Sequence, residues 1–497
     1  MGELLLGLDI GTASSKAVLA RPDGSIVGTA RRAHRTSMPQ PGWVEHDAMG
    51  VWWSDVRALC DELLSPQTRG DLAGVCVSGI GPCVVPCDAE GRPLRPAILY
   101  GIDARAHEEI EELNRRFDED QILRRGGSML SSQAIGPKLL WLQRHEPDVW
   151  RHTARWYMAS SFVVARLTGE YVLDHHSASQ CDPLYDLEAG DWAHDWADEI
   201  TGGVPLPTLA WPAEVVGTVT ARGSDDSGLP PGVPVVAGTV DAWAEACSVG
   251  VRRRGDMMLM YGSTMFIIAV DDAPRVHPKL WSTAGVDPGT RCLAAGMATS
   301  GAVIEWLREL AADVPVEELV AEAAGTAPGA DGVLMLPYFA GERSPLFDPD
   351  ARGVVAGLTL SHRRGHLARA AYEATGLGVR HNLETIERAG WTPRRIVAVG
   401  GGATGGFWPQ VISDVAGVTQ LVPEQTIGAS YGDALMAAIG TGLVAPETDW
   451  TIINERIAPR EDTRRLYDRQ YGLYRRLYDD TLDISHELAA LQRESLA

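Results

Sequence analysis

The chain has 497 residues, which is too long for one ordinary hydrophobic core and therefore predicts two large domains. Its apolar content of 45% is typical of a globular protein. The formal net charge of −22 argues against a general nucleic-acid binder, because such a protein needs a basic face. A local positive pocket for a phosphorylated small molecule remains compatible with this charge.

Targeting signals and metal-binding cysteines are not predicted. The N-terminal apolar run is short, lacks a basic leader and ends at Asp9, unlike a signal peptide. No uninterrupted apolar run of about 18 residues predicts a membrane span. The seven cysteines are irregularly spaced, and the closest pair, Cys83 and Cys87, has no second cluster to complete a zinc site. We expect reduced, mostly buried thiols in a cytoplasmic protein, with neither nucleic acid nor a membrane as partner.

The first 28 residues predict a β-meander. Residues 4–10 form an expected buried strand, residues 17–20 a second strand, and the Asp-Gly pair within residues 21–28 a hairpin turn. The segment Gly11–Lys16 lies at the first turn, and it combines glycine, three hydroxyl side chains and one of only three lysines in the chain. This composition raises the question of whether the segment is a simple turn or a binding site.

The later elements alternate between strands and helices. The apolar spacing predicts helices over 51–64 and 137–150, the second with Pro137 at its N-terminus, and a strand over 72–81. In order, the rest of the chain predicts a strand and helix within 229–251, a strand–turn–strand unit over 255–270, a strand, glycine loop and helix over 394–417, a helix over 428–442 and a solvated helix within 459–492. The unit over 255–270 resembles the N-terminal hairpin, which suggests two halves of similar architecture joined near residues 243–255.

Three glycine-rich and hydroxyl-rich turns follow apolar strands, at Gly11–Lys16, Gly262–Thr264 and Gly400–Gly406. Glycine allows a backbone to approach phosphate oxygens closely, and adjacent N–H groups can then bind an anion. Each turn alone is also compatible with an ordinary strand end. Their occurrence together favours a phosphate site.

The third turn also matches a dinucleotide-binding pattern, because Gly400, Gly402 and Gly405 have the spacing of that fingerprint and Glu424 lies near the expected distance for a ribose-binding acid. The fingerprint usually opens a domain, whereas this match comes late in the chain. A single match is therefore weak support for a dehydrogenase.

Two aspartates at strand ends are candidate catalytic groups. Asp9 could simply cap its own turn, and Asp241 could be the N-cap of a helix that begins near Ala242. Phosphoryl transfer, however, needs a Mg²⁺ ligand and a base for the attacking hydroxyl. A carboxylate suits both tasks.

The ordered motifs of the whole chain resemble those of the FGGY carbohydrate kinases, relatives of glycerol kinase, xylulokinase and ribulokinase within the actin/hexokinase/Hsp70 superfamily. The matching segments are Asp9–Lys16, PGWVEHDAMGVWW (41–53), GRPLRPAILY (91–100), PKLLWL (137–142), GTVDAW (238–243), YGST (261–264), residues 337–359, residues 400–417 and GASYGDALMAA (428–438). The resemblance implies an α/β, two-domain actin/hexokinase-like (ribonuclease H-like) fold with an interdomain catalytic cleft. It further implies an N-terminal domain over 1–243 on the sugar side and an ATP-binding C-terminal domain over 244–497.

The same resemblance implies a role for each matching residue. Asp9 would hold Mg²⁺, and Asp241 would be the base on the substrate hydroxyl. The residues expected to contact ATP are Thr12, Ser14, Lys16, Gly262, Ser263, Gly301, Glu305, Gly401, Gly402 and Gly406. Domain closure would bring the γ-phosphate to the hydroxyl and exclude water.

The sugar side departs from the family pattern. Xylulokinases usually carry Gly-Gln-Met-His-Gly in the first substrate loop, whereas Gly81 and Pro82 replace the Met-His pair here. Asp103 and Arg105 could read sugar hydroxyls, or they could form a local surface ion pair. The segment Trp43, Glu45 and His46 could line the same pocket, with packing as the alternative for Trp43.

The sequence therefore predicts an ATP- and Mg²⁺-dependent kinase for a small sugar, with a pentulose such as xylulose first and xylulokinase as the nearest layout. The alternatives are a kinase for another polyol or ketose (ribulose, a tetritol, a hexulose, a deoxy-ketose or glycerol) and a non-catalytic nucleotide or sugar sensor. A dehydrogenase is the weakest alternative. Dimers occur in the family, so a homodimer is compatible with the resemblance.

Overall fold

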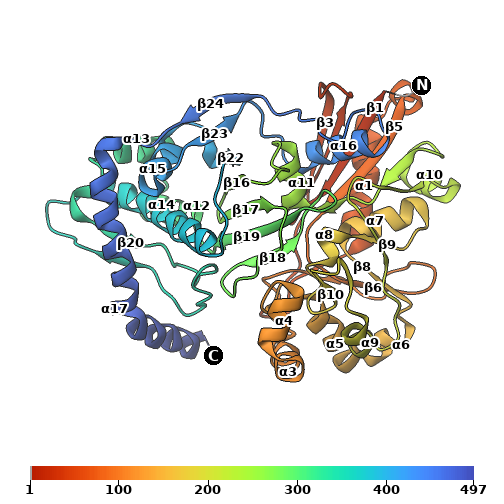
Figure 1. Ribbon diagram of the computed structural model, residues 1–497, viewed down its shortest axis with the longest axis horizontal. Helices are drawn as coiled ribbons and strands as arrows, with labels where there is room; N and C mark the ends of the chain where they lie inside the picture. Colours follow the sequence, from red (N-terminus) through yellow and green to blue (C-terminus); the bar gives the residue numbers. More distant parts are fainter. Residues whose placement is uncertain (1–2, 497) are drawn as a thin grey trace. The chain divides into compact units, whose positions relative to one another are not determined.

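The computed structural model describes residues 3–496 (Figure 1). Its residues pack into two compact units, and neither unit is continuous in the sequence. Unit 1 comprises Met1–Arg254, Val270–Cys292 and Ile427–Thr451, and unit 2 comprises Gly255–Ala269, Leu293–Thr426 and Ile452–Ala497. The expected domain boundary between residues 243 and 244 stays a prediction.

Unit 1 is built on a mixed sheet in the order β13-β14-β5-β1-β2-β3, with β15 also paired to β5. Its strands are β1 (Leu4–Ile10), β2 (Ser14–Ala20), β3 (Ile26–Ala33), β5 (Leu72–Gly79), β13 (Val215–Thr218), β14 (Pro234–Val236) and β15 (Thr239–Val240). The central strand β1 runs antiparallel to β2 and parallel to β5, and all of its residues are buried. The predicted meander is confirmed, but β2 begins at Ser14 because Lys16 pairs with Asp9 and Ser15 with Ile10. The first turn is therefore shorter than expected.

Two helices cover opposite faces of this sheet. Helix α16 (Ala429–Gly440) packs against β1, where a Cβ on Gly7 would lie 1.9 Å from the carbonyl oxygen of Ser430. On the other face, a Cβ on Gly79 would lie 2.8 Å from that of Ala159 in helix α7 (Ala159–Thr168). Figure 1 shows the blue helix α16, from late in the chain, beside the red strands of the N-terminus.

The predicted helices of unit 1 differ from the structure at their ends. The helix expected over 51–64 begins as a π-helix, η1 (Ala48–Trp53), which is capped by the Asp47 carboxylate and continues as α1 (Ser54–Leu63). The single helix expected over 137–150 is wrong, because α5 (Ile135–His145) ends before Glu146 and α6 (Pro147–His152) begins at a proline that has no N–H to continue it. The expected helix after Asp241 is α11 (Asp241–Ser248).

Short elements complete unit 1. The helices are α2 (Pro66–Gly70), α3 (His107–Phe117), α4 (Glu119–Gly126), α8 (His175–Ala178), α9 (His194–Thr201) and α10 (Ala221–Ser227). The strands are β4 (Glu45–His46), β6 (Val85–Cys87), β7 (Ala97–Ile98), β8 (Arg155–Tyr157), β9 (Val172–Asp174), β10 (Tyr185–Asp186), β11 (Asp191–Trp192), β12 (Thr208–Ala210) and β18 (Trp281–Ala284).

Unit 2 repeats the hairpin-plus-parallel-strand arrangement in the order β19-β17-β16-β22-β23-β24. Its strands are β16 (Asp256–Tyr261), β17 (Met265–Asp271), β19 (Arg291–Met297), β22 (Arg395–Val399), β23 (Gln420–Pro423) and β24 (Ile453–Ile457). Strand β16 runs antiparallel to β17 and parallel to β22, as β1 does with β2 and β5. The expected similarity of the two hairpins is thereby confirmed.

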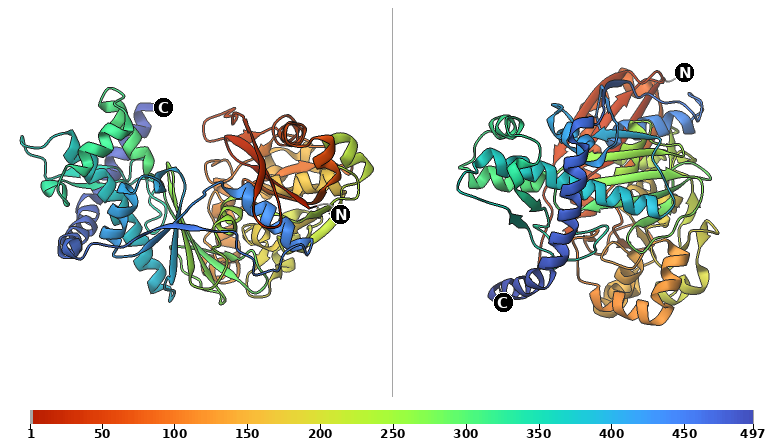
Figure 2. Two further views of the ribbon diagram at one scale, coloured as in Figure 1. Left: turned by 90° about the horizontal axis from the view of Figure 1, so that it is seen from above. Right: turned by 60° about the vertical axis from the view of Figure 1, so that its left-hand side comes forward.

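The helices of unit 2 include the long C-terminal helix, which ends at the C label in both views of Figure 2. They are α12 (Gly301–Leu310), α13 (Val316–Ala324), α14 (Arg364–Arg388), α15 (Phe407–Ala416) and α17 (Arg464–Leu496). The short elements are η2 (Ala330–Gly332), β20 (Leu334–Leu336), β21 (Val354–Ala356), η3 (Gly401–Ala403) and η4 (Glu461–Thr463).

All seven cysteines are buried and free, as the sequence predicts. Within residues 3–496, no helix is both long and apolar enough to cross a membrane.

Candidate functional site

The first hairpin brings an aspartate and a lysine together at its open end. Asp9 and Lys16 are register partners on β1 and β2, and Lys16 Nζ lies 3.8 Å from Asp9 Oδ2. The Asp9 side chain is buried, whereas the Lys16 side chain is 41% exposed. The hairpin thus presents a partly exposed cation beside a buried carboxylate.

Asp9 has the properties of a cation ligand. Its Oδ1 is buried and accepts no hydrogen bond from the described residues. Burial raises the pKa of Asp9 to about 6, although the positive charge of nearby Lys16 opposes the increase. An unpaired carboxylate oxygen in a buried position fits a hard divalent cation such as Mg²⁺.

Thr12 and Ser14 lie on the same turn. The turn closes through a hydrogen bond from the Gly11 N–H to the Ser14 carbonyl oxygen, at 3.2 Å. Ser14 is buried at the start of β2, and the Thr12 hydroxyl lies 3.0 Å from the Tyr100 hydroxyl. The expected phosphate-contacting residues Thr12, Ser14 and Lys16 are therefore contiguous with Asp9.

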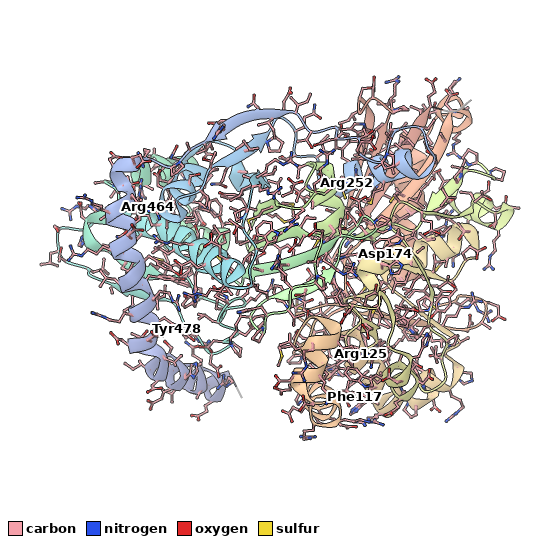
Figure 3. All side chains as sticks on the ribbon, in the orientation of Figure 1. Phe117, Arg125, Asp174, Arg252, Arg464 and Tyr478 are labelled. Atoms are coloured by element: carbon pink, nitrogen blue, oxygen red, sulfur yellow. The ribbon has the colours of Figure 1, made fainter. Side chains whose placement is uncertain are left out.

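Asp241 is held at the start of α11 by the strand before it. The carboxylate of Asp174, labelled in Figure 3, accepts hydrogen bonds from the Ser177 N–H at 3.0 Å and from the Thr239 hydroxyl at 2.9 Å. Thr239 belongs to β15, which leads directly into Asp241. Asp241 is the first helical residue rather than the residue before the helix, so the N-cap alternative is wrong, and its Oδ1 accepts the Ala242 N–H at 2.7 Å.

The negative charge of Asp9 affects the pKa values of two further carboxyl groups, Asp241 and Glu245. Burial and the negative charge of Asp9 raise the pKa of Asp241 to about 8. Burial also raises the pKa of Glu245, one helical turn later, where Lys16 and Asp9 have opposite effects. A carboxyl group whose pKa lies near neutral pH can accept a proton from a hydroxyl group, as a general base does.

Sequence reasoning missed Asp433 and Ser78, which lie behind Asp9. Asp433 on α16 is fully buried and accepts a hydrogen bond from the Ser78 hydroxyl at 2.7 Å. Burial raises the pKa of Asp433 well above its usual range, and Asp9 adds to the increase. Only the packing of α16 on β1 and β5 reveals this contact, since more than 350 residues separate the partners.

The expected sugar-side residues lie in two places. Gly81 lies against β15, since a Cβ at this position would be 2.7 Å from the Val240 side chain, and Pro82 beside it is buried. This loop therefore contacts the residue immediately before Asp241. Its role in sugar recognition stays a prediction.

Asp103 and Arg105 form an ion pair, but not on the surface. Arg105 Nη2 lies 2.7 Å from Asp103 Oδ2, Arg105 Nη1 lies 2.9 Å from Glu45 Oε1, and the side chains of Asp103 and Arg105 are almost fully buried. The guanidinium also stacks on Trp43 at 4.0 Å. The alternative of a surface ion pair is wrong, because both side chains are buried, with Trp43 and Glu45 in contact with Arg105. Recognition of sugar hydroxyls by the two residues stays a prediction.

Unit 2 gathers a second set of expected residues around its own hairpin turn. The Gly262 carbonyl oxygen accepts the Gly301 N–H at 3.0 Å, and the Ser263 carbonyl oxygen accepts the N–H groups of Ser300 and Ala302. A Cβ on Gly301 would lie 2.7 Å from the Gly262 carbonyl oxygen, so only glycine fits here. The second turn is thus joined to the N-terminus of α12.

The glycine-rich loop lies on the same hairpin. A Cβ on Gly402 would be 2.5 Å from the Trp408 ring, and that ring packs edge-on against Tyr261 with centroids 5.2 Å apart. Gly401 and Gly406 border open space, and Gly406 has a left-handed φ of 72°. Glu305 is the exception among the expected residues, because it is exposed and pairs with Arg308 at 2.6 Å.

The expected residues are divided between the two units. Asp9, Thr12, Ser14, Lys16, Gly81, Pro82, Asp103, Arg105 and Asp241 belong to unit 1, and Gly262, Ser263, Gly301, Glu305, Gly401, Gly402 and Gly406 belong to unit 2. Among the described residues, no group of three or more histidine, cysteine or acidic side chains forms a ready-made metal cage. A cation at Asp9 would need further ligands from water or from a bound phosphate.

Comparisons with known proteins cover nearly the whole chain. Residues 4–247 match the N-terminal domain model of the FGGY family of carbohydrate kinases, and residues 257–441 match its C-terminal domain model. The chain is 29% identical to the xylulose kinase of Escherichia coli K12, over 97% of this chain and 100% of that protein. It is 27% identical to a glycerol kinase of Alkalilimnicola ehrlichii, over 95% and 98% respectively.

Solved structures agree with these matches. The crystal structure of xylulose kinase from Rhodospirillum rubrum superimposes with a TM-score of 0.90 at 33% identity, covering 97% of this chain and all of that one. A xylulose kinase structure from Brucella ovis gives a TM-score of 0.89 at 27% identity, with the same coverage. The expected two-domain kinase fold is thereby confirmed.

Proposed function

The chain belongs to the FGGY family of carbohydrate kinases, and from this premise we propose that it transfers the γ-phosphate of ATP to a hydroxyl group of a pentulose, with xylulose as the leading candidate. The enzyme is a phosphotransferase with an alcohol group as acceptor, and ATP is the phosphate donor. Its similarity to xylulose kinases over 96% or more of its length supports the choice of sugar. The family-model boundaries also support a division near residue 243.

One observation carries the proposal: Asp9 of β1 and Thr239 of β15 both pair with Ser78 of β5, so that Asp9 and the start of the Asp241 helix lie at the same end of one sheet. Lys16 lies beside Asp9. In this proposal Asp241 accepts the proton of the sugar hydroxyl as that oxygen attacks the γ-phosphorus. Its raised pKa makes the ionised carboxylate a stronger base than an ordinary aspartate, and the base is formed as pH rises toward about 8. Lys16 offsets negative charge on the transferring group, and so do the N–H groups of the two glycine turns.

Mg²⁺ fits the unpaired, buried Oδ1 of Asp9. When bound, the ion would supply positive charge to the phosphate oxygens of ATP. Without a cation, the Asp9 and Asp241 carboxylates repel each other, which is part of the reason that the pKa of Asp241 is raised. The cofactor set we propose is therefore ATP with Mg²⁺ at Asp9.

A second candidate is a kinase for another polyol or ketose. Gly81 and Pro82 stand where xylulokinases usually carry a Met-His pair, and this smaller loop lies against the residue before Asp241. The loop therefore has fewer side-chain donors and more room than the usual xylulokinase pocket. Ribulose, a tetritol, a hexulose, a deoxy-ketose or glycerol would be the substrate in that case.

The test is sugar-dependent ADP release with Mg-ATP over a panel of these compounds, each compared with the rate without sugar. We expect D-xylulose to give the largest increase and Asp241→Ala to abolish it. A larger increase with another sugar would replace xylulose by that sugar. If ATP binds but no compound stimulates turnover, the catalytic proposal fails and a nucleotide sensor becomes the better description.

A further inference from the structure

We propose that His34, charged and held by Asp55, is a positioning residue that orients the backbone N–H groups of the first glycine turn toward the phosphates of ATP. This inference rests on the proposed function of that turn. It assigns a role to His34, which is not one of the candidate site residues. His34 follows β3, and Asp55 lies at the start of α1. Both side chains are largely buried within unit 1.

The hydrogen bonds of His34 require a proton on each ring nitrogen. Nδ1 lies 2.8 Å from Asp55 Oδ2, while Nε2 lies 3.0 Å from the Gly11 carbonyl oxygen and 3.2 Å from that of Thr12. Carboxylate and carbonyl oxygens can only accept hydrogen bonds. Both nitrogens therefore donate, and the ring is an imidazolium. The Ser15 hydroxyl donates to the same Asp55 oxygen at 2.7 Å, which fixes the carboxylate on the side of the turn.

Three consecutive carbonyl groups of the turn point toward this histidine. The ring binds those of Gly11 and Thr12, and the backbone N–H of His34 donates to the Ala13 carbonyl oxygen at 3.1 Å. The Thr36 hydroxyl adds a second bond to the Thr12 carbonyl oxygen, at 3.0 Å. Every acceptor of the turn between residues 11 and 13 is thus engaged from one side.

Because of the geometry of the peptide bond, this orientation of the carbonyl groups of residues 11–13 creates an anion site on the other side of the turn. In a trans peptide the N–H points opposite to the C=O of the same plane. Since the carbonyls of residues 11–13 point toward His34, the N–H groups of Thr12, Ala13 and Ser14 point away from it. Successive N–H groups that share one direction form a concavity that binds phosphate. If His34 lost its proton, one of its two ring donors would be lost, and the Gly11 and Thr12 carbonyl oxygens would be held less tightly, by the remaining bonds of the turn.

The charged groups around His34 favour its protonated form. Burial alone would lower the pKa of His34, but the hydrogen bond and negative charge of Asp55 outweigh it, so the pKa is raised above 6.5. Asp9 on β1 adds negative charge nearby. His46 on β4, whose ring centroid lies 5.1 Å away, has its pKa lowered to about 4 by burial and by His34, so it stays neutral.

His46 provides a matched control in the same core. Its Nδ1 accepts the indole N–H of Trp52 at 3.0 Å, and its Nε2 lies 3.1 Å from the Thr36 hydroxyl. A His46→Gln variant would disturb packing about as much as His34→Gln does, but it leaves the imidazolium at the turn. His46 reaches the turn only indirectly, through Thr36, so a difference between the two variants reports the direct contact of the charged His34 ring.

The experiment measures the dissociation constants of ATP, ADP and AMP on the full-length protein by calorimetry, from pH 6.5 to 9, with thermal unfolding as a check of the fold. For His34→Gln at pH 6.5, we expect ATP to bind roughly tenfold more weakly, the effect of losing about one charge-assisted hydrogen bond, while AMP changes less than about twofold. Because a raised pKa means that the charge is present at low pH and is lost as pH rises, the ATP difference from wild type should close toward pH 9. His46→Gln should keep the wild-type ratio of ATP to AMP affinity.

Asp55→Asn tests the same inference if His34→Gln does not fold. Without the carboxylate, the pKa of His34 falls, so the loss of ATP affinity with rising pH should begin at lower pH. A folded His34→Gln with an unchanged ATP-to-AMP ratio overturns the inference, as does an unshifted pH dependence in Asp55→Asn. Failure of wild type to bind ATP would instead refute the proposed function, and turnover with sugar is not needed for any of these readouts.

Discussion

The two hairpin turns of this chain have the same plan but different means of support. In unit 1, the carbonyls of Gly11 and Thr12 are held by the charged ring of His34. In unit 2, the carbonyls of Gly262 and Ser263 are held by three backbone N–H groups at the start of α12. Both arrangements turn successive carbonyls to one side. The support in unit 1 titrates, whereas the support in unit 2 does not.

The two turns also differ in the side chains around them. Asp9 and Lys16 flank the first turn, whereas no charged residue occupies positions 261–264 of the second. We expect the first turn to contribute to chemistry and ATP binding, and the second to contribute to ATP binding alone.

The largest effect should follow from removing the charge of Asp241. Asp241→Asn keeps the size and the Ala242 contact but cannot accept a proton, so kcat should fall by about 10²-fold or more with little change in the KM for ATP. In wild type, kcat should rise with pH as the carboxyl group, whose pKa burial raises to about 8, loses its proton. Steady-state kinetics from pH 5 to 9 checks both points. The exposed Asp198 offers a control substitution to Asn, and unchanged turnover in Asp241→Asn would remove the residue from the mechanism.

A second large effect should follow at Asp9. Asp9→Asn removes the proposed Mg²⁺ ligand, so half-saturation with Mg²⁺ should need roughly tenfold more metal. It also removes a negative charge that raises the pKa of Asp241, so the acidic fall in kcat should move to lower pH. A Mg²⁺ titration and a pH profile of the same variant measure the two effects. A normal Mg²⁺ titration would contradict the metal role.

The second turn, Gly262–Thr264, can be disrupted by a substitution at Gly301. The added methyl group of Gly301→Ala would lie 2.7 Å from the Gly262 carbonyl oxygen and force the second turn away from α12. We expect the KM for ATP to rise by about tenfold, equally at pH 6.5 and 9, because the support there carries no titrating group. Gly472→Ala, with no atom within 4 Å of the new methyl group, is the matched control. A pH-dependent effect would mean that the two turns are not as different as the structure indicates.

The smallest effect concerns stability behind the first turn. The pKa of Asp433 is raised in the folded chain, so the folded chain holds this proton to a higher pH than the unfolded chain does. The free energy of unfolding therefore falls as pH rises from the usual aspartate pKa toward the raised one. Asp433→Asn keeps an acceptor for the Ser78 hydroxyl and carries no charge. Its Tm should exceed that of wild type by about 2–4 °C at pH 8, and the gap should close toward pH 4. A lower Tm at pH 8 would show that the ionised carboxylate stabilises the fold.

Local sequence patterns predicted the elements around the site. The apolar run that ends in Asp9, the Asp-Gly hairpin and the strand–turn–strand at 255–270 all formed as expected, because short-range periodicity and turn chemistry decide them. Of two predictions that were wrong, one had a local cause, because Pro147 divides the expected helix, and the other depended on residues that are close only in space. Residues 137–150 break at Glu146, and the Asp103–Arg105 pair is buried under the Trp43 segment.

The sequence by itself determined the two hairpins, the family and the identity of the charged residues at Asp9, Lys16 and Asp241, since these depend on order and spacing along the chain. Only the tertiary structure decided what surrounds them. Helix α16 returns from late in the chain to place Asp433 behind Asp9, and β3 and α1 bring His34 and Asp55 to the back of the first turn. The physical reason is that a buried charge takes its pKa and its orientation from neighbours in space, and no local pattern specifies them.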